Sequence, residues 1–449
     1  MKELKNHYFF RNNGENIKKY INLGDIDDLL VIGLQEEIEG QRRTRLVDEL
    51  ASKSFSGRMI DWMQEEDLIL RSNGTIEATP VGYDDYNLRI LSLPSFHHLY
   101  RGENKKFLAS VPSLNRQLTG FTGIERELRR VVAYARAVQF FDFLLKFEIT
   151  KFWLGHVCDI NYLALAQHYG FPTELFDLTH DIRVALFFAT CKYIPKTDSY
   201  VPLSQADIDA DEESKYGCIF HTPNWVINWN DGYGASRISM IQSKRNHKPL
   251  RLCSGDLDNI ALQIGYQPFY RCHYQRGYIM PDVISKSLQE QPVFEKLYFK
   301  QSPELSQWVF DAMNQEKSIF PYEGLTEARP YIEYIKQNTI FSKDDICHVY
   351  ENEYIGKTTF NSLQDLLKKI DGYHMDDKLI KIVDHTVEIP LPLRLKKEID
   401  KKYNCNDIFN MISKIHIKPQ DRAFRQAIHR GIYVKQSIEV FTKSRCIIF

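Results

Sequence analysis

The sequence lacks the closely spaced cysteines that zinc ribbons and dithiol redox sites require, because none of its eight cysteines forms a Cys-x-x-Cys pair. Disulfide frameworks are typical of small secreted domains, so we expect reduced thiols and a cytoplasmic location for this chain of 449 residues. The densest apolar run, Val184–Cys191, is far shorter than the roughly 18 residues of a spanning helix. The first residues lack the apolar core of a signal peptide. We therefore expect no membrane segment.

Neither sign of charge dominates, because 58 Lys and Arg residues face 59 Asp and Glu residues. This balance does not indicate an obligate nucleic-acid binder. Hydrophobic residues make up 43% and aromatic residues 13% of the chain, which excludes a disordered protein. The Gly-x-Ser-x-Gly motif of serine hydrolases and the phosphate-binding P-loop are both absent from the sequence. No second histidine lies at close metal-ligand spacing from His168, so we predict no metal site.

The length predicts two to four domains. Residues 1–92 show two helical patterns and then two β-prone runs around Asn73-Gly74, an order that resembles a winged helix. Such a unit binds nucleic acid, docks to protein or caps the neighbouring domain, and the pattern leaves all three open. Residues 93–340 are predicted to form a mixed α/β (α+β) domain. Residues 341–449 form a third, basic region, whose surface is either simply solvated or meets RNA or DNA.

The first motif that suggests chemistry is Tyr100-Arg101-Gly102, which follows a short β-prone stretch. A glycine at this place lets a ligand approach the backbone closely. Arg101 offers a planar fork of donors for a carboxamide, carboxylate or phosphate. The alternative is a structural salt bridge made by Arg101, and the tripeptide alone does not decide between the two.

The second motif spans residues 166–179. Its first half is typical of a helix end, with Gly170 as a left-handed stop. His168, just before that stop, is a base, a donor to a ligand or a cap of the helix C-terminus. Leu175–Leu178 then reads as a buried strand. An unpaired Asp177 would be costly there, and Arg101 is its expected partner.

The third motif contains Arg271 and Gln275, which precede Gly277 on a loop or strand edge. A glutamine can hold an amide or a hydroxyl group, but it cannot act as a general base. The alternative is a polar loop that satisfies only its own backbone.

Together, these segments resemble the FRG domain family, named for its Phe/Tyr-Arg-Gly motif, over about residues 94–335. The matching segments are Tyr100-Arg101-Gly102, Gln167–Gly170, Pro172-Thr173, Asp177, Thr179, Ala185–Ala189, Gln275–Gly277 and Phe320-Pro321. Leu178 departs from the family, which often has Trp after the aspartate. The resemblance implies a bacterial or phage-borne protein tied to phage defence or toxin–antitoxin behaviour.

The layout is also similar, more distantly, to that of ADP-ribosyltransferases, which implies a mixed sheet of that type and NAD as cofactor. The catalytic residues it implies are Arg101, His168 and Gln275. The cofactor-binding residues it implies are Tyr100, Gly102, Tyr169, Asp177 and Thr179. Tyr169 or Tyr100 would stack on nicotinamide, and Asp177 and Thr179 would hold the strand and the ribose. Gln275 replaces the glutamate of many transferases, which favours a nucleic-acid acceptor.

Three functions remain open at this point. The leading hypothesis is an NAD-dependent ADP-ribosyltransferase-like toxin of antiphage defence, acting on nucleic acid or protein, with an antitoxin or phage protein as partner. The second is a non-catalytic module that senses or binds a nucleotide or nucleic acid. The third is a nuclease or other hydrolase with His168 as base, which the lack of paired metal-binding carboxylates disfavours.

Overall fold

The structure is a computed structural model of the chain. It describes residues 98–156, 160, 162–223, 262–264, 267–281, 287–291, 294–352, 359–404 and 407–408, and four strands at 7–11, 19–23, 68–70 and 76–78. The helical part of the expected winged helix and the basic stretch after residue 408 lie outside the described residues. On either side of Asn73-Gly74, β3 (Leu68–Leu70) pairs antiparallel with β4 (Ile76–Ala78), while the expected winged helix stays a prediction.

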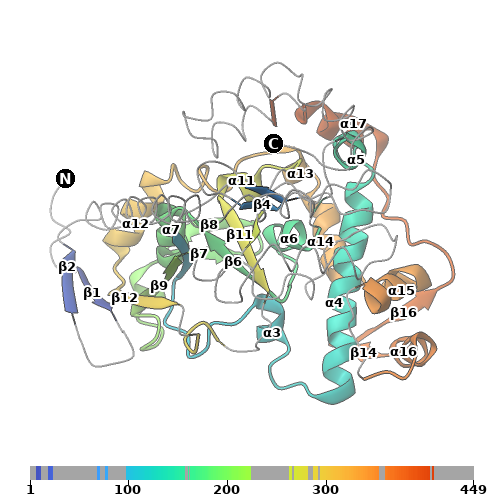
Figure 1. Cartoon of the computed structure of the whole chain (residues 1–449), viewed down its shortest axis with the longest axis horizontal. Helices are drawn as coiled ribbons and strands as arrows, with labels where there is room; N and C mark the ends of the chain where they lie inside the picture. The colour runs from blue at the N-terminus through green and yellow to red at the C-terminus, as the bar shows by residue number, and fades with distance from the viewer. Residues whose placement is uncertain are drawn as a thin grey trace, which may run out of the picture.

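One eight-stranded sheet forms the left half of the view in Figure 1. Every neighbouring pair in it is antiparallel. The strands are, in order, β10 (Leu262–Gln263), β11 (Gly277–Pro281), β6 (Leu175–Thr179), β5 (His98–Glu103), β9 (Tyr216–Pro223), β12 (Glu295–Lys300), β1 (His7–Arg11) and β2 (Lys19–Leu23). Strands β1 and β2 come from the segment expected as a separate N-terminal domain, whose boundary at residue 92 stays a prediction.

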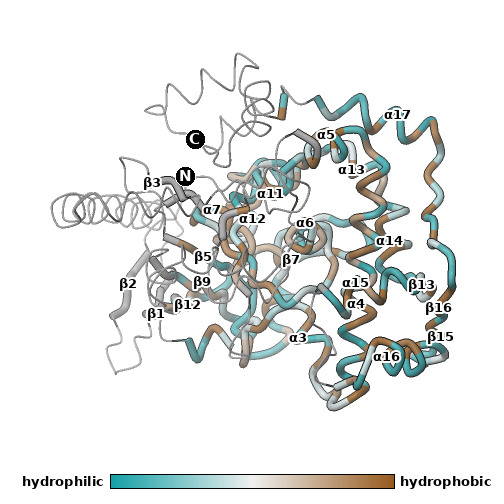
Figure 2. Tube along the Cα trace, turned by 45° about the vertical axis from the view of Figure 1, so that its right-hand side comes forward, coloured by the Kyte–Doolittle hydropathy of each residue, from teal (hydrophilic) through white to brown (hydrophobic). Residues whose placement is uncertain are grey.

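The right half of the same view is mostly helical, so the expected mixture of helices and strands is confirmed. Its central element is α4 (Gly123–Leu144), which contains no proline and buries side chains around most of its circumference. The helices that share its hydrophobic core are α5 (Glu148–His156), α6 (Tyr162–His168), α14 (Arg329–Gln337), α15 (Lys343–Asn352), α16 (Leu363–Ile370) and α17 (Leu393–Lys402). Figure 2 shows brown, hydrophobic residues along α4 and α6, whereas α17 is mostly teal.

Three shorter helices and two small strand pairs complete this helical half. The helices are α3 (Ser113–Gln117), α11 (Arg271–Tyr274) and α13 (Gly324–Glu327). The strand pairs are β13 (Ile340–Ser342) with β16 (Lys381–Val383), and β14 (His374–Met375) with β15 (Lys378–Leu379). The β13–β16 pair is parallel, unlike the pairs of the large sheet.

A second core lies where α7 (Ile182–Thr190) packs on the sheet beside α12 (Pro303–Ala312). Most of the densest apolar run of the sequence, Val184–Cys191, falls in α7, and seven of the nine residues of this helix are buried. Its first turn is capped by Asp181, whose carboxylate accepts a hydrogen bond from the Arg183 backbone N–H at 3.0 Å. The helix continues into a hairpin of β7 (Cys191–Ile194) and β8 (Ser199–Pro202).

The acidic stretch after β8 is fastened to the end of β5. It begins with α8 (Gln205–Ile208), which Ser204 caps. Lys105 pairs with Asp211 at 2.5 Å, and the backbone N–H of Lys106 donates to the Glu213 carbonyl at 3.1 Å. These contacts hold the stretch beside the strand that carries the Tyr-Arg-Gly motif.

The hairpin between β14 and β15 offers a stability test. Its two turn residues, Asp376 and Asp377, have φ angles of 49° and 62°. Glycine adopts this conformation without steric cost, and Asp-Gly is a favoured pair for such turns. We expect Asp377→Gly to raise the unfolding free energy by about 0.5–1 kcal/mol in urea titrations. Lys378→Gly, in the neighbouring strand, should lower it, and a loss of stability in Asp377→Gly would contradict this account of the turn.

Candidate functional site

The site lies where two neighbouring strands separate. Strands β5 and β6, which both lie within the described residues, share a single cross-strand pair, Tyr100 with Thr179. Because residues alternate between the faces of a strand, Asp177 and Gly102 point to the same face of the sheet as that pair. Helices α6 and α7 cover this face on either side of the gap. The separation therefore opens a space bounded by the sheet and the two helices.

A cavity of about 320 Å³ occupies this space. It is lined by seven of the eight residues that the sequence predicts for the site. These are Tyr100, Arg101, Gly102, His168, Asp177, Thr179 and Gln275. Residues up to 175 positions apart in sequence thus meet at one place, as the three motifs indicate, while their roles stay predictions. The size is at the lower end of the range for small-molecule sites.

His168 is buried, and only 2% of its side chain is exposed. Its Nδ1 lies 2.7 Å from the Gln275 Oε1, so Nδ1–H donates to that oxygen. Burial lowers the pKa of His168, although the charge of Asp177 and the bond to Gln275 oppose the shift. The ring is consequently neutral at pH 7, and its Nε2 carries a lone pair.

This Nε2 faces the carboxylate of Asp177. The distance from Nε2 to Oδ1 is 3.9 Å, which is too long for a hydrogen bond. Both atoms are buried, and neither has a hydrogen-bond partner among the described residues. An unpaired buried polar group is costly. A group that donates a proton to each atom would satisfy both, so the pair is suited to receive one from a ligand.

Thr179 positions Gln275. Its hydroxyl donates to the Gln275 backbone carbonyl at 2.8 Å and accepts from the Asp181 backbone N–H at 3.1 Å. The hydroxyl therefore connects the end of β6 to the turn before β11. Gln275 in turn fixes the His168 ring, and its amide oxygen is occupied by that contact. Within this geometry Gln275 is a positioning residue.

Arg101 differs from expectation in its partners. Its Nε donates to the Glu103 carboxylate at 2.9 Å, and its Nη1 donates to the backbone carbonyl of Asp177 at 3.1 Å. The expected ion pair with the Asp177 carboxylate is therefore wrong. The guanidinium instead donates a hydrogen bond to a backbone carbonyl of β6 at the point where β5 and β6 separate. The Asp177 side chain is instead 43% exposed and is open to the cavity.

Position 102 requires glycine for a packing reason that the sequence motifs did not indicate. A Cβ atom at this position would lie 1.7 Å from the Ala185 carbonyl oxygen and 2.8 Å from the Ala189 nitrogen. The missing side chain thus allows α7 to lie directly on β5. The glycine serves helix–strand packing, and the direction in which its side chain would point is filled by protein.

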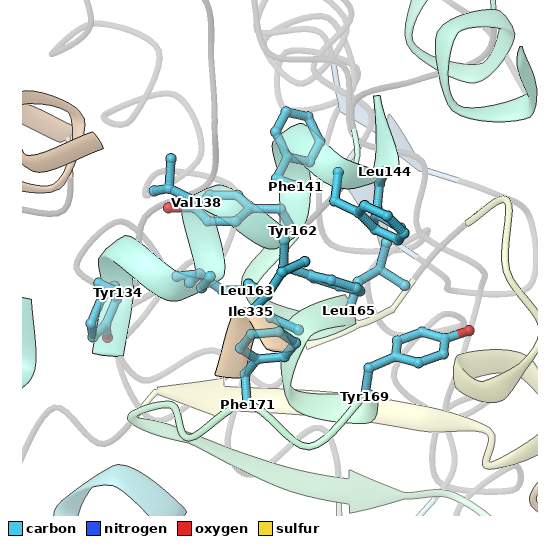
Figure 3. Close-up of a cluster of buried hydrophobic side chains, with 14 of the residues drawn as sticks. Tyr134, Val138, Phe141, Leu144, Tyr162, Leu163, Leu165, Tyr169, Phe171 and Ile335 are labelled. Atoms are coloured by element: carbon cyan, nitrogen blue, oxygen red, sulfur yellow. The ribbon is translucent and has the colours of Figure 1, made fainter. Parts of the chain in front are cut away.

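Tyr169 does not line the cavity, so the expectation that it stacks on nicotinamide there is wrong. Successive helical residues point about 100° apart, and Tyr169 lies in the core beside α6 (Figure 3). Its hydroxyl donates to the buried Glu323, and the Arg271 guanidinium lies 4.8 Å from its ring centre. The alternative, Tyr100, does line the cavity and stacks on His221 at 5.2 Å.

An aromatic wall, which the sequence motifs indicate only in part, also lines the cavity. Four rings from α7, the β7–β8 hairpin and the segment after α12 line the cavity, namely Phe188, Tyr193, Tyr200 and Phe320. Tyr200 lies at the centre, with ring centres 5.2–5.5 Å away. Arg271 fixes the hairpin through an ion pair with Asp198. Two of its rings lie in segments that carry the family resemblance, Phe188 in Ala185–Ala189 and Phe320 in Phe320-Pro321, whereas no motif indicated Tyr193 and Tyr200.

Two of the charged side chains that line the cavity have no ion-pair partner among the described residues. Among its described lining residues, Arg101 pairs with Glu103 at 2.9 Å and Arg271 pairs with Asp198. The remaining ions are Asp177 and Arg116. Arg116 has no ion pair within the described part of the chain, and neutral His168 is all that faces the Asp177 carboxylate at short range. The cavity therefore presents one uncompensated charge of each sign.

A buried histidine next to this site predicts a pH dependence of stability. His273 is fully buried, and burial lowers its pKa from 6.5 to about 4. Below about pH 6.5, His273 therefore binds a proton in the unfolded chain but not in the folded protein. The free energy of unfolding consequently decreases as the pH is lowered. We expect a loss of about 2 kcal/mol between about pH 7.5 and about pH 5 in urea titrations. His273→Gln should flatten the slope, and equal stability at both pH values would contradict the assignment.

Comparisons with known proteins agree with the central motif. Residues 97–198 match the FRG domain. No curated protein and no solved structure matches the chain. Among the described residues, no helix has the length and apolar character needed to cross a membrane. The matched segment, which includes β5, α6, β6 and α7, supplies most of the residues that line the cavity. The chain therefore carries an FRG domain at residues 97–198.

Proposed function

We propose that the chain is an NAD-dependent ADP-ribosyltransferase that acts as an FRG-domain toxin in antiphage defence. The observation that carries this proposal is the Asp177 carboxylate, which is open to a cavity and faces the lone pair of a neutral, buried histidine. A carboxylate stabilises positive charge, and a neutral imidazole accepts a proton. Transfer of a ribosyl group from NAD can use both.

The reaction breaks the bond between the ribose C1′ and the nicotinamide nitrogen. The bonding electrons leave with nicotinamide, which departs neutral, and positive charge develops on the sugar. Asp177 would stabilise this charge electrostatically. The oxygen or nitrogen of the acceptor then forms the new bond to C1′, and its proton passes to His168 Nε2. Gln275 holds the ring in the tautomer that leaves Nε2 free to accept.

The aromatic wall and the size of the cavity are compatible with part of a dinucleotide. Rings such as Tyr193 and Tyr200 offer flat surfaces for a base or for nicotinamide, and Arg101 offers donors to a carboxamide. A volume of about 320 Å³ suits one nucleoside end, with the rest of the molecule extending outward. NAD is therefore a donor that these residues can hold.

The expected acceptor follows from the likeness to ADP-ribosyltransferases, and the expected partner follows from the FRG family resemblance. A nucleic acid is the favoured acceptor and a protein the alternative, and an antitoxin or a phage protein is the expected partner. The second candidate function is a non-catalytic module that senses a nucleotide or nucleic acid. The unpaired cation Arg116 favours it, because a pocket that only binds phosphate needs such a group and no base.

The test is incubation of the purified protein with labelled NAD and a cell lysate, with and without phage lysate. Label in the RNA, DNA or protein fraction, with release of nicotinamide, is the expected result, and the labelled fraction identifies the acceptor class. NAD that stays intact under both conditions would overturn the proposed transferase activity. Salt-dependent binding of nucleotide without turnover would then support the sensing module.

A further inference from the structure

Arg116 is a cation whose side chain forms no hydrogen bond or ion pair with the described residues. It lies in the last turn of α3 and lines the cavity. More than a third of its surface is exposed. Its guanidinium lies 5.8 Å from the centre of the Phe107 ring, which also lines the cavity. The side chain is therefore supported from one side and reachable from the other.

The electrostatic setting of Arg116 is unfavourable in the ligand-free protein. Burial and the positive charge of Arg101 lower its pKa, and only Glu103 acts in the opposite direction. Glu103 is already engaged, because its carboxylate accepts hydrogen bonds from Arg101 and from Ser110. No carboxylate within the described ranges forms an ion pair with Arg116. An anion placed here would gain attraction from two guanidinium groups and displace none of their partners.

The kind of anion follows from the rest of the cavity. A guanidinium binds carboxylates and phosphates through paired N–H donors. A wall of four aromatic rings lines the same cavity, and base-sized rings stack on such surfaces. A ligand that combines a flat ring with a phosphate is a nucleotide. The uncompensated Asp177 in the same cavity repels a ligand that is anionic throughout, and it favours one with a neutral or cationic sugar end.

We infer that Arg116, supported by Phe107, binds the diphosphate of a nucleotide diphosphate sugar held in this cavity. The inference depends on the proposed function for the location of the ligand in this cavity, and it does not depend on turnover. It assigns the phosphate contact to a residue outside the Tyr-Arg-Gly motif. Arg101, which is bound to Glu103 and to the Asp177 carbonyl, is left to orient the sugar end.

The experiment is calorimetric titration of the full chain with ADP-ribose and with adenosine, in wild type, Arg116→Gln and Arg394→Gln. ADP-ribose has no nicotinamide bond to break, so binding is measured without reaction. Arg394 is 91% exposed and does not line the cavity, so it controls for the loss of a charge. We expect Arg116→Gln to weaken ADP-ribose binding about 10-fold or more and to leave adenosine binding unchanged. Arg394→Gln should bind both as the wild type does.

Three results would overturn the inference. They are wild-type protein that does not bind ADP-ribose, Arg116→Gln protein that binds it normally, and a loss of adenosine binding equal to that of ADP-ribose. The Arg116 side chain makes no hydrogen bond or ion pair within the described chain, so its replacement should leave the melting temperature unchanged, and a thermal melt verifies this. Arg116-dependent binding of ADP-ribose together with intact NAD would refute the transferase alone. NAD cleavage with an unchanged KM in Arg116→Gln would refute the phosphate site alone.

Discussion

Asparagine in place of Asp177 is expected to lower kcat for NAD cleavage by about 100-fold or more. The two side chains have nearly the same shape, but the amide carries no charge to stabilise the developing ribosyl cation. A 100-fold loss corresponds to about 3 kcal/mol of transition-state stabilisation. The measurement is nicotinamide release from NAD by purified wild-type and variant protein, with ADP-ribose affinity measured in parallel.

The same substitution should leave the fold intact. The Asp177 side chain forms no hydrogen bond with the described residues, and its Oδ1 faces only the His168 ring at 3.9 Å. Replacement therefore removes no native contact, and the melting temperature should stay within about 2 °C of the wild type. Asp209→Asn, on the exposed acidic stretch, is the matched control and should keep full activity. Normal kcat in Asp177→Asn would remove the carboxylate from the mechanism.

Gly102→Ala is expected to destabilise the protein by about 3 kcal/mol or more. The added methyl group would lie 1.7 Å from the Ala185 carbonyl oxygen. That atom belongs to the backbone of α7, so no side chain can rotate away, and the helix must move off the sheet. Since α7 carries one boundary of the cavity, the site should open as well. Chemical denaturation measures the loss, and a fall in ADP-ribose affinity would accompany it.

Gly120→Ala separates this clash from the general cost of replacing a glycine. Gly120 has φ of 90°, and a Cβ atom there would meet nothing within 4 Å. Its replacement should cost only the strain of a left-handed residue, about 1 kcal/mol. Equal losses in the two variants would contradict the packing role of Gly102. A stable, inactive Gly102→Ala protein would restore the reading in which the glycine admits a ligand.

Local patterns predicted the elements that meet at the site. Gly170 has φ of 83°, which confirms the predicted left-handed end of α6, and the apolar run after Asp181 is the buried helix α7. Both features depend on a few neighbouring residues. The arrival of Gln275 beside His168 and Asp177 was predictable only through the family motif, because the His168–Gln275 contact joins residues 107 positions apart.

Residue orientation and long-range pairing explain what the sequence did not reveal. His168 and Tyr169 are adjacent, yet one side chain enters the cavity and the other enters the core, because a helix turns about 100° per residue. The Arg271–Asp198 ion pair joins residues 73 positions apart, and no local pattern encodes it. The order of strands in the sheet likewise depends on such pairings. Arg116 had no motif around it, and only its position beside Arg101 marks it.

Photo-crosslinking with an azido-adenine analogue of NAD tests the central claim most directly, because it locates the ligand whether or not the chain turns it over. The account predicts saturable labelling of peptides that line the cavity, within residues 100–116, 167–200 or 271–320, and competition by excess ADP-ribose. Arg116→Gln should reduce the labelling at a given concentration. Labelling confined to residues outside the cavity, or none that ADP-ribose competes away, would contradict the account.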